Sequence, residues 1–309
     1  MKTRLRHYTP VAVLLALILV VSTLPGLFLG GEKGDADRRV LVTNYPLYVA
    51  AQNILGDTHG VELTLLSGAG AGCLHDYQLT PADRLAIDRA DLVIINGAGA
   101  EPFLDGLVEE IRLVDTSAGM DLLESAGHHH HEEQDHHHEA CYNEHVWVSP
   151  ARYYAQVLAV LSALEEVDPA NGDTYLANAS TYVQQMEAVG EGFPLSLNRP
   201  CVLFHDSLVY LAEYVGLDVK LVLSADGESG LSATDLAKVE ALAKENPDLA
   251  LLYDTQYPIR YTAIDGLVPA QQVLALETAV VGEGKPSDWL DAMERNLEKL
   301  QKLTGGDTP

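Results

Sequence analysis

The sequence predicts an α/β fold of two lobes, each with a mostly parallel sheet flanked by helices, joined by a long rigid helix. Short apolar runs alternate with amphipathic helical segments, an order typical of parallel sheets covered on both faces. This alternation occurs twice, and two long helical segments separate the two halves. A chain of 309 residues with 47% hydrophobic content is large enough to bury the cores of two such lobes.

The first 38 residues have the order of an export signal and are not expected to belong to the fold. Basic residues at positions 2, 4 and 6 precede an apolar run that extends over residues 11–29. The run is near the ~20 residues that span a bilayer, so a cleaved signal peptide and a retained membrane anchor both stay open. Either alternative places the rest of the protein outside the cytoplasm, in the periplasm or on the extracellular face of the cytoplasmic membrane.

Residues 39–150 are expected to form the N-terminal α/β lobe. Strands are predicted at residues 39–44, 61–66 and 91–96, and helices at residues 47–55 and 81–90. Thr80 and Asp83 have the spacing of a capping box, with Pro81 at the first helical position. A glycine-rich link, residues 68–72, follows the second strand.

Residues 151–195 are expected to be helical and to connect the lobes. Ser149 suits the N-cap of a helix that ends near Glu166. One face of that helix is apolar and carries Tyr154, Val157, Leu158, Leu161 and Leu164. A second amphipathic segment, residues 172–189, is the predicted connecting helix.

Residues 196–309 are expected to form the C-terminal α/β lobe, which repeats the pattern. Strands are predicted at residues 200–204, 219–223, 249–253 and 272–276, and helices at residues 208–215, 232–244 and 288–303. Gly216 is a natural stop for the first of these helices, and Ser232 with Asp235 caps the second.

A histidine-rich loop is predicted over residues 127–140, inside the N-terminal lobe. Seven histidines lie there among four acidic residues, and imidazole is the commonest protein ligand for zinc. The tract is polar and has no apolar periodicity, so we expect a mobile loop that collects zinc weakly. The alternative is a solvated low-complexity spacer.

Three further histidines and one glutamate lie at the ends of predicted elements. His75 and His145 each precede a helix, His205 lies between a strand and a helix, and Glu277 directly follows a strand. Ligands of open α/β sheets bind outside the carboxyl ends of the strands, and three imidazoles with one carboxylate complete a tetrahedral zinc shell. The sequence therefore predicts a Zn²⁺ site in the cleft between the lobes. Each histidine taken singly could instead belong to the core.

The charge and the cysteines restrict the partners and the disulfides. The formal net charge of −26 argues against nucleic acids and anionic membrane surfaces as partners. Cys73, Cys141 and Cys201 allow at most one disulfide in an oxidising compartment. Because Cys73 and Cys141 each lie near a predicted ligand histidine, a bridge between them is our hypothesis.

Motifs around these residues make the chain resemble the metal-specific solute-binding proteins of ABC transporters, the cluster that takes up zinc or manganese. The motifs are VTNYP at 42–46, HDYQLTP at 75–81, ADLVIINGAG at 90–99, HVWVSP at 145–150 and FHD at 204–206. The resemblance covers about residues 40–303. It implies two α/β lobes joined by a long rigid helix, with the metal held between them.

The resemblance assigns the three histidines of the predicted site to the three ligand positions of the family. Histidine at the third position and an acidic histidine-rich loop before the second resemble the zinc branch, whereas the manganese branch usually has glutamate at the third position. The fourth position is commonly aspartate, and Glu277 stands there, so glutamate and water both stay open as the fourth ligand. Asp254 and Asp206 are expected to support ligands.

The expected function is capture of Zn²⁺ and its delivery to the membrane permease of an ABC transporter, by a monomer that is not an enzyme. One alternative is a manganese-binding member of the same family. Others are an extracellular zinc buffer or adhesin and a zinc-dependent hydrolase, although the sequence has no His-Glu-x-x-His motif.

Overall fold

The computed structural model describes residues 37–66, 74, 77–107, 113–125, 142–223, 231–255, 264 and 266–304. Residues 1–36 of the predicted export signal or anchor, the glycine-rich link, the histidine-rich loop, His75, Cys73 and Cys141 lie outside these residues. The prediction that the fold begins after residue 38 is wrong by one residue, because Arg38 is the first residue of strand β1 (Arg38–Val42). Arg38–Pro309 form one compact unit. Of the described helices, none is both long and apolar enough to cross a membrane.

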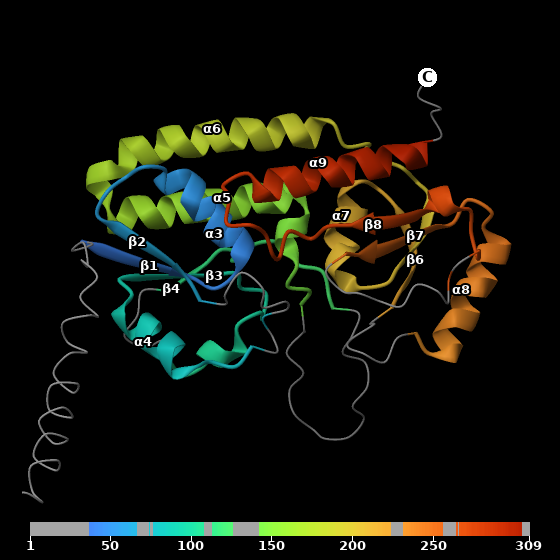
Figure 1. The fold of residues 1–309 in the computed structure, drawn as a ribbon, viewed down its shortest axis with the longest axis horizontal. Coiled ribbons are helices and arrows are strands. Elements are labelled where there is room, and N and C mark those ends of the chain that lie inside the picture. Colours follow the sequence, from blue (N-terminus) through green and yellow to red (C-terminus); the bar gives the residue numbers. More distant parts are fainter. Residues whose placement is uncertain are drawn as a thin grey trace, which may run out of the picture. The chain divides into compact units, whose positions relative to one another are not determined.

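Two four-stranded sheets organise the fold, and all their strand pairs are parallel. The first has the order β2-β1-β3-β4, with β1 at Arg38–Val42, β2 at Val61–Leu65, β3 at Leu92–Ile95 and β4 at Leu113–Asp115. The second has the order β6-β5-β7-β8, with β5 at Pro200–Leu203, β6 at Asp218–Val222, β7 at Ala250–Asp254 and β8 at Val273–Leu276. The predicted fold class is confirmed (Figure 1). The prediction omits β4, because three residues are too few to show a strand pattern.

Helices flank both sheets: α3 at Tyr45–Leu55, α4 at Pro81–Arg89, α5 at Pro150–Val167, α6 at Gly172–Glu191, α7 at Val209–Tyr214, α8 at Ala233–Glu245 and α9 at Asp288–Gln301. Figure 1 shows α3, α5, α6 and α9 on one side of the sheets, with α4 across the first sheet from them and α8 beside the second. The predicted connecting helix is α6, whose 20 residues follow α5 and precede the second sheet.

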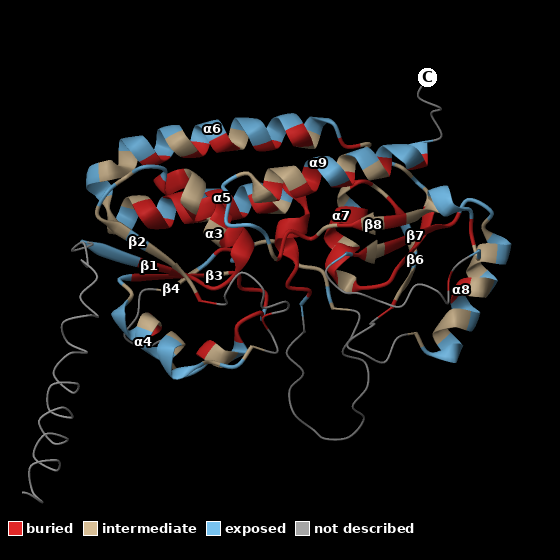
Figure 2. Ribbon diagram, viewed as in Figure 1, coloured by how far each residue is buried: buried red, intermediate tan, exposed pale blue. Residues whose placement is uncertain are grey.

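The two sheets share one hydrophobic core. A single cluster of buried side chains joins strands of both sheets with α3, α5, α6, α7 and α9. Along β1, Val40 and Val42 enter this shared core, whereas Leu41 packs with Ile87 of α4 on the opposite face. Figure 2 shows the burial concentrated in the strands and on the inner sides of these helices. A hinge motion between the sheets would therefore expose apolar surface to water, which is unfavourable.

The buried face of α5 differs from the predicted one. Most of the predicted stripe is buried, but Tyr154 and Leu158 are 38% and 41% exposed. Tyr153 and Val160 are buried instead, because α5 packs against both α3 and α6. A helix with a broad apolar stripe can bury either of two overlapping faces, which differ by a rotation of about one residue. The neighbouring helices decide which of these faces is buried. Ser149 is at the N-cap position, but its hydroxyl makes no capping bond.

Capping signals at other helices act as predicted. Thr80 and Asp83 form both bonds of a capping box at α4, and the Ser232 side chain caps α8. Gly216 follows α7 with φ +69°, and an added Cβ there would lie 2.7 Å from Ser196 Cα. A side chain at this position would be strained by the positive φ and would clash with the backbone.

Candidate metal centre

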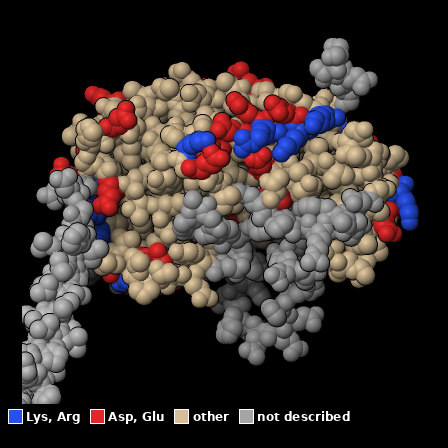
Figure 3. All heavy atoms as spheres, in the orientation of Figure 1, with Lys and Arg blue, Asp and Glu red and all other residues tan. Residues whose placement is uncertain are grey.

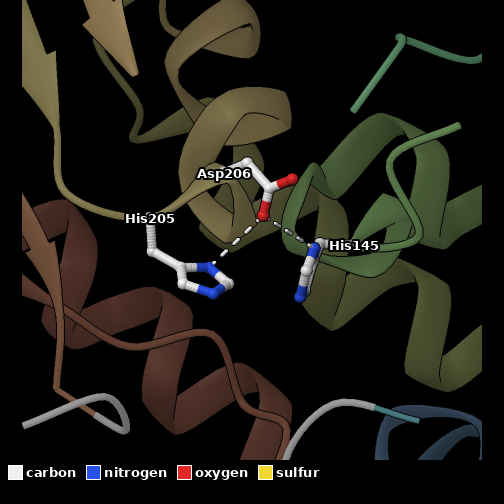
Figure 4. Close-up of side chains that lie close together, drawn as sticks. All are labelled: His145, His205 and Asp206. Atoms are coloured by element: carbon white, nitrogen blue, oxygen red, sulfur yellow. Dashed lines mark ion pairs between the residues drawn. The ribbon is translucent and has the colours of Figure 1, made fainter. Parts of the chain in front are cut away.

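Two of the predicted ligands, His145 and His205, lie side by side. His205 follows β5 and begins the turn before α7, and His145 precedes the 3₁₀ turn Val146–Val148 that leads into α5. Their ring centroids are 5.6 Å apart at 87°, and each residue is 4% exposed. Asp206 joins them, since one ligand atom from each of the three residues lies within 4.8 Å of the others (Figure 4). This candidate metal group, two imidazoles and a carboxylate, is a donor set suited to a divalent metal ion.

Asn143 fixes the ring of His145. Its side-chain oxygen accepts the backbone N–H of His145 at 2.9 Å and lies 3.0 Å from His145 Nδ1. Because an amide oxygen only accepts, Nδ1 donates the hydrogen and the lone pair that binds metal is on Nε2. Trp147 packs against the ring, with centroids 5.4 Å apart. The orientation that a metal ligand needs is thus set by residues two positions away on either side.

His205 makes a different bond through its Nδ1. That nitrogen accepts the backbone N–H of Ser207 at 3.0 Å, so the neutral ring carries its hydrogen on Nε2 in this arrangement. Binding of a metal at Nε2 requires the other tautomer, whose Nδ1–H would face Asp206 Oδ1, now 3.4 Å away. The same oxygen lies 3.8 Å from His145 Nδ1. Asp206 is therefore placed to support both rings.

Asp254, at the end of β7, supports His205 through an intermediate residue. Its carboxylate is almost fully buried and accepts the hydroxyls of Ser207, at 3.1 Å, and Thr278, at 3.0 Å. Ser207 is the residue whose N–H binds the His205 ring. A change at Asp254 would therefore alter the position of the turn that orients this histidine.

The segments on both sides of the histidine-rich loop are bonded next to the candidate metal group. Ser125 Oγ donates to Asp206 Oδ2 at 2.8 Å, and Asn143 Nδ2 donates to the Asp206 carbonyl at 2.8 Å. Glu124 and Tyr142 form an antiparallel bridge. The described residues that precede and follow the loop are thus held together beside Asp206.

Two tryptophans connect the segment after His145 with the second half of the chain. Trp147 Nε1 donates to the Thr278 carbonyl at 2.8 Å, and Trp289 Nε1 donates to the Trp147 carbonyl at 3.0 Å. Trp289 is fully buried and stacks on Tyr153, with centroids 4.3 Å apart. No local sequence pattern identifies these supporting contacts, because each joins residues that are distant along the chain.

The fourth predicted ligand, Glu277, has other partners. Its carboxylate accepts Arg295 Nε at 2.9 Å, Arg295 Nη2 at 2.7 Å and Lys299 Nζ at 3.4 Å. Burial alone would raise the pKa of Glu277, but the bonds and charges of these two cations outweigh burial and lower it. Among the described residues, the structure therefore brings His145 and His205 together and does not bring Glu277 to them. The remaining predicted ligand, His75, is not among the described residues.

A buried carboxyl group, Glu101, supports the loop before the candidate metal group. Glu101 accepts Thr43 Oγ1 at 2.6 Å and the backbone N–H groups of Asn96 and Gly97 at 2.8 Å and 3.1 Å. The Asn96 side chain in turn donates to the carbonyl of Glu144, at 2.9 Å, just before the first histidine of the group. Burial raises the pKa of Glu101 to about 7, although these donors act in the opposite direction.

One family model, described as zinc-uptake complex component A, periplasmic, matches residues 40–303. The chain belongs to this family. Its members are metal-binding solute-binding proteins and not enzymes. The match confirms the resemblance that the sequence motifs indicate.

Relatives of the chain are named for different metals. The zinc-binding lipoprotein AdcA of Streptococcus pneumoniae is 26% identical over 311 residues, which cover 94% of this chain and 61% of AdcA, so the chain spans less than two thirds of that relative. The manganese-binding lipoprotein MntA of Halalkalibacterium halodurans is 23% identical over 285 residues, covering 87% of this chain and 89% of MntA. The solved structure of the SBP FpvC from Pseudomonas aeruginosa in complex with Mn²⁺ has a TM-score of 0.70 at 22% identity, covering 86% of this chain and 98% of FpvC. That likeness establishes the fold.

Proposed function

We propose that the protein captures Zn²⁺ between its two sheets and delivers it to the membrane permease of an ABC transporter. The observation that carries the proposal is the meeting of the buried imidazoles of His145 and His205 with the Asp206 carboxylate. His75 is proposed as the third imidazole ligand, from its sequence motif. Neutral imidazoles bind zinc and release protons as they do so. The match to a zinc-uptake family favours transport over zinc storage.

The donor types favour zinc over manganese. Imidazole nitrogens suit zinc, whereas manganese prefers shells rich in oxygen. Relatives named for zinc and for manganese both match the chain, so a manganese-binding protein of the same family is the second candidate. The match to the manganese-binding lipoprotein MntA, over 87% of this chain and 89% of MntA, is the observation that favours this second candidate.

Delivery requires that the permease distinguish the loaded protein from the empty one, so the metal must stabilise one arrangement over another. The core that both sheets share opposes a large hinge motion. We therefore expect the change on loading to be local, in the segments that carry the two described histidines.

We further propose an exported monomer whose histidine-rich loop collects zinc for the cleft site. The apolar N-terminal segment supports export, either as a cleaved signal or as an anchor. The bonds from Ser125 and Asn143 to Asp206 support the collecting role, because these described residues before and after the loop lie next to the candidate metal group.

The test is calorimetric titration of the protein with zinc and with manganese, with and without residues 127–140. We expect one tight zinc ion per chain that survives loop deletion. His145→Ala and His205→Ala are each expected to lower zinc affinity by more than about 100-fold. Loss of a residue that only supports a ligand lowers metal affinity by at most about 100-fold, so a larger loss indicates a ligand. His59→Ala, in the turn before β2, is the matched control and should leave affinity unchanged.

Three outcomes would contradict the proposal: tight zinc binding by His205→Ala, loss of tight binding on loop deletion, or tighter binding of manganese than of zinc. Because protons compete with metal for imidazole, zinc affinity should also be weaker at pH 5 than at pH 7.5. Equal affinity at both pH values would argue against a histidine-rich site.

A further inference from the structure

Glu277 stands at the sheet edge from which the candidate metal group is built. It directly follows β8, the second histidine of the group follows β5, and only β7 lies between these strands. Neighbouring strands are ~4.8 Å apart, so the ends of β5 and β8 are separated by roughly 10 Å. The next residue, Thr278, binds Trp147 through its carbonyl and Asp254 through its hydroxyl, and both of these support a histidine of the group. A glutamate side chain turned toward the cleft from this position would approach the metal.

Helix α9 holds the carboxylate of Glu277 in another direction. Arg295 binds both carboxylate oxygens, and Lys299 lies one helical turn further along the same face. Asn296, between them, holds the Glu277 backbone by donating to its carbonyl at 2.7 Å and accepting its N–H at 2.8 Å. Figure 3 shows acidic and basic side chains gathered over α9. The helix therefore fixes both the main chain and the side chain of this residue.

We propose that Arg295, assisted by Lys299, determines metal specificity by keeping the Glu277 carboxylate out of the metal shell. This inference rests on the proposed metal site. The bidentate pair must be broken before Glu277 can act as a ligand, and a charge-assisted pair of this geometry is stronger than an ordinary hydrogen bond. The shell that remains is rich in imidazole nitrogen.

The consequence is selectivity against hard cations. Zinc is satisfied by a small number of imidazole ligands, so it does not need the withheld carboxylate. Manganese favours oxygen donors, so it must bind weakly or displace Glu277 from Arg295. The pair thus penalises manganese more than zinc, although neither Arg295 nor Lys299 touches the metal. Specificity of this kind arises from withholding a ligand rather than from adding one.

The test is a set of variants of the full-length protein titrated separately with Mn²⁺ and Zn²⁺. Arg295→Gln is expected to raise manganese affinity about fivefold, which corresponds to the upper end of the free energy that a partly exposed ion pair contributes. It should change zinc affinity less than about twofold. Arg295→Gln with Lys299→Gln should raise manganese affinity further, to about tenfold. Adding Glu277→Gln to either variant should abolish the gain, and Glu277→Gln alone should change neither affinity by more than about twofold.

The matched control is Arg84→Gln, which removes an arginine from an exposed pair with Asp88 on α4 and should change neither affinity. Unchanged manganese affinity in both the single and the double α9 variant would overturn the inference. A drop in zinc affinity of more than about tenfold in Glu277→Gln alone would also overturn it, because that loss identifies a ligand in direct use. If His205→Ala retains tight zinc, the proposed site itself fails. If His205→Ala loses tight zinc binding but the Arg295 variants show unchanged manganese affinity, the proposed metal site stands and only the specificity role of Arg295 is overturned.

Discussion

Glu101 is expected to make the stability of the protein fall as the pH rises from 4.5 to 7. The ordinary pKa of this carboxyl is 4.5, and burial, which outweighs the donors Thr43, Asn96 and Gly97, raises it to about 7 in the folded protein. The folded protein therefore holds the proton more tightly than the unfolded chain does. Its stabilising contribution is fully present below pH 4.5 and is lost as the pH rises through 7. At ~1.4 kcal/mol for each pKa unit, the whole difference is about 3.5 kcal/mol.

The perturbation that isolates this effect is Glu101→Gln, which removes the titrating group. Glutamine also replaces one accepting oxygen by a donor, so the variant should be less stable than the wild-type protein at every pH. The informative quantity is the gap between the two free energies of unfolding. We expect that gap to be about 3 kcal/mol larger at pH 4.5 than at pH 8, because only the wild-type protein titrates here.

Urea unfolding followed by circular dichroism, at constant ionic strength across the pH range, measures both free energies. Glu187→Gln, at an exposed glutamate on α6, is the matched control and should show no such change with pH. A gap between wild type and Glu101→Gln that stays constant from pH 4.5 to 8 would refute the assignment of a raised pKa to this group.

Three further changes test the contacts around the site and the fold. Asp254→Asn weakens the bonds from Ser207 and Thr278 that position the turn at His205, and we expect zinc affinity to fall by about tenfold in calorimetric titration; an unchanged affinity would remove Asp254 from the supporting role. Trp289→Phe keeps an aromatic ring on Tyr153 but leaves the Trp147 carbonyl without its N–H donor, so urea unfolding should show a loss of about 1–3 kcal/mol; no loss would mean that this bond contributes nothing net. Gly216→Ala and Gly119→Ala both place alanine at positive φ, but only position 216 has backbone in contact with the added Cβ. Thermal unfolding should therefore show a larger decrease for Gly216→Ala, by at least about 1 kcal/mol, and equal decreases would contradict the clash.

Much of the secondary structure follows from local sequence alone. Strands β3, β5, β7 and β8 show near-continuous apolar runs, and the helices begin at capping signals such as Thr80 and end at signals such as Gly216. These features act over a few residues, because strand periodicity, capping bonds and the φ preference of glycine are local properties. The order of strands and helices is enough to predict two parallel sheets and the connecting helix α6.

The candidate ligands are also marked locally, by histidines placed at the ends of strands and the starts of helices. His205 lies at the carboxyl end of β5, as expected for a ligand of an open α/β sheet, whereas His145 precedes the 3₁₀ turn before α5 and is brought beside it by tertiary contacts such as the bond from Asn143 to the Asp206 carbonyl. Sequence also singles out Asp206 and Asp254 as supporting residues. It does not reveal Asn143 or Thr278, whose contributions depend on contacts with residues distant along the chain.

Tertiary structure decided what each side chain does once the elements have packed. The rotation of α5 depends on α3 and α6, so Tyr154 and Leu158 are exposed although their spacing matches the apolar stripe. Glu277 has the sequence position of a metal ligand, but α9 brings Arg295 and Lys299 against its carboxylate. The sequence by itself determined the elements, the fold class and the donor types, because those depend on neighbouring residues. The direction of a helix face and the partner of a carboxylate were decided only by the packing of distant segments.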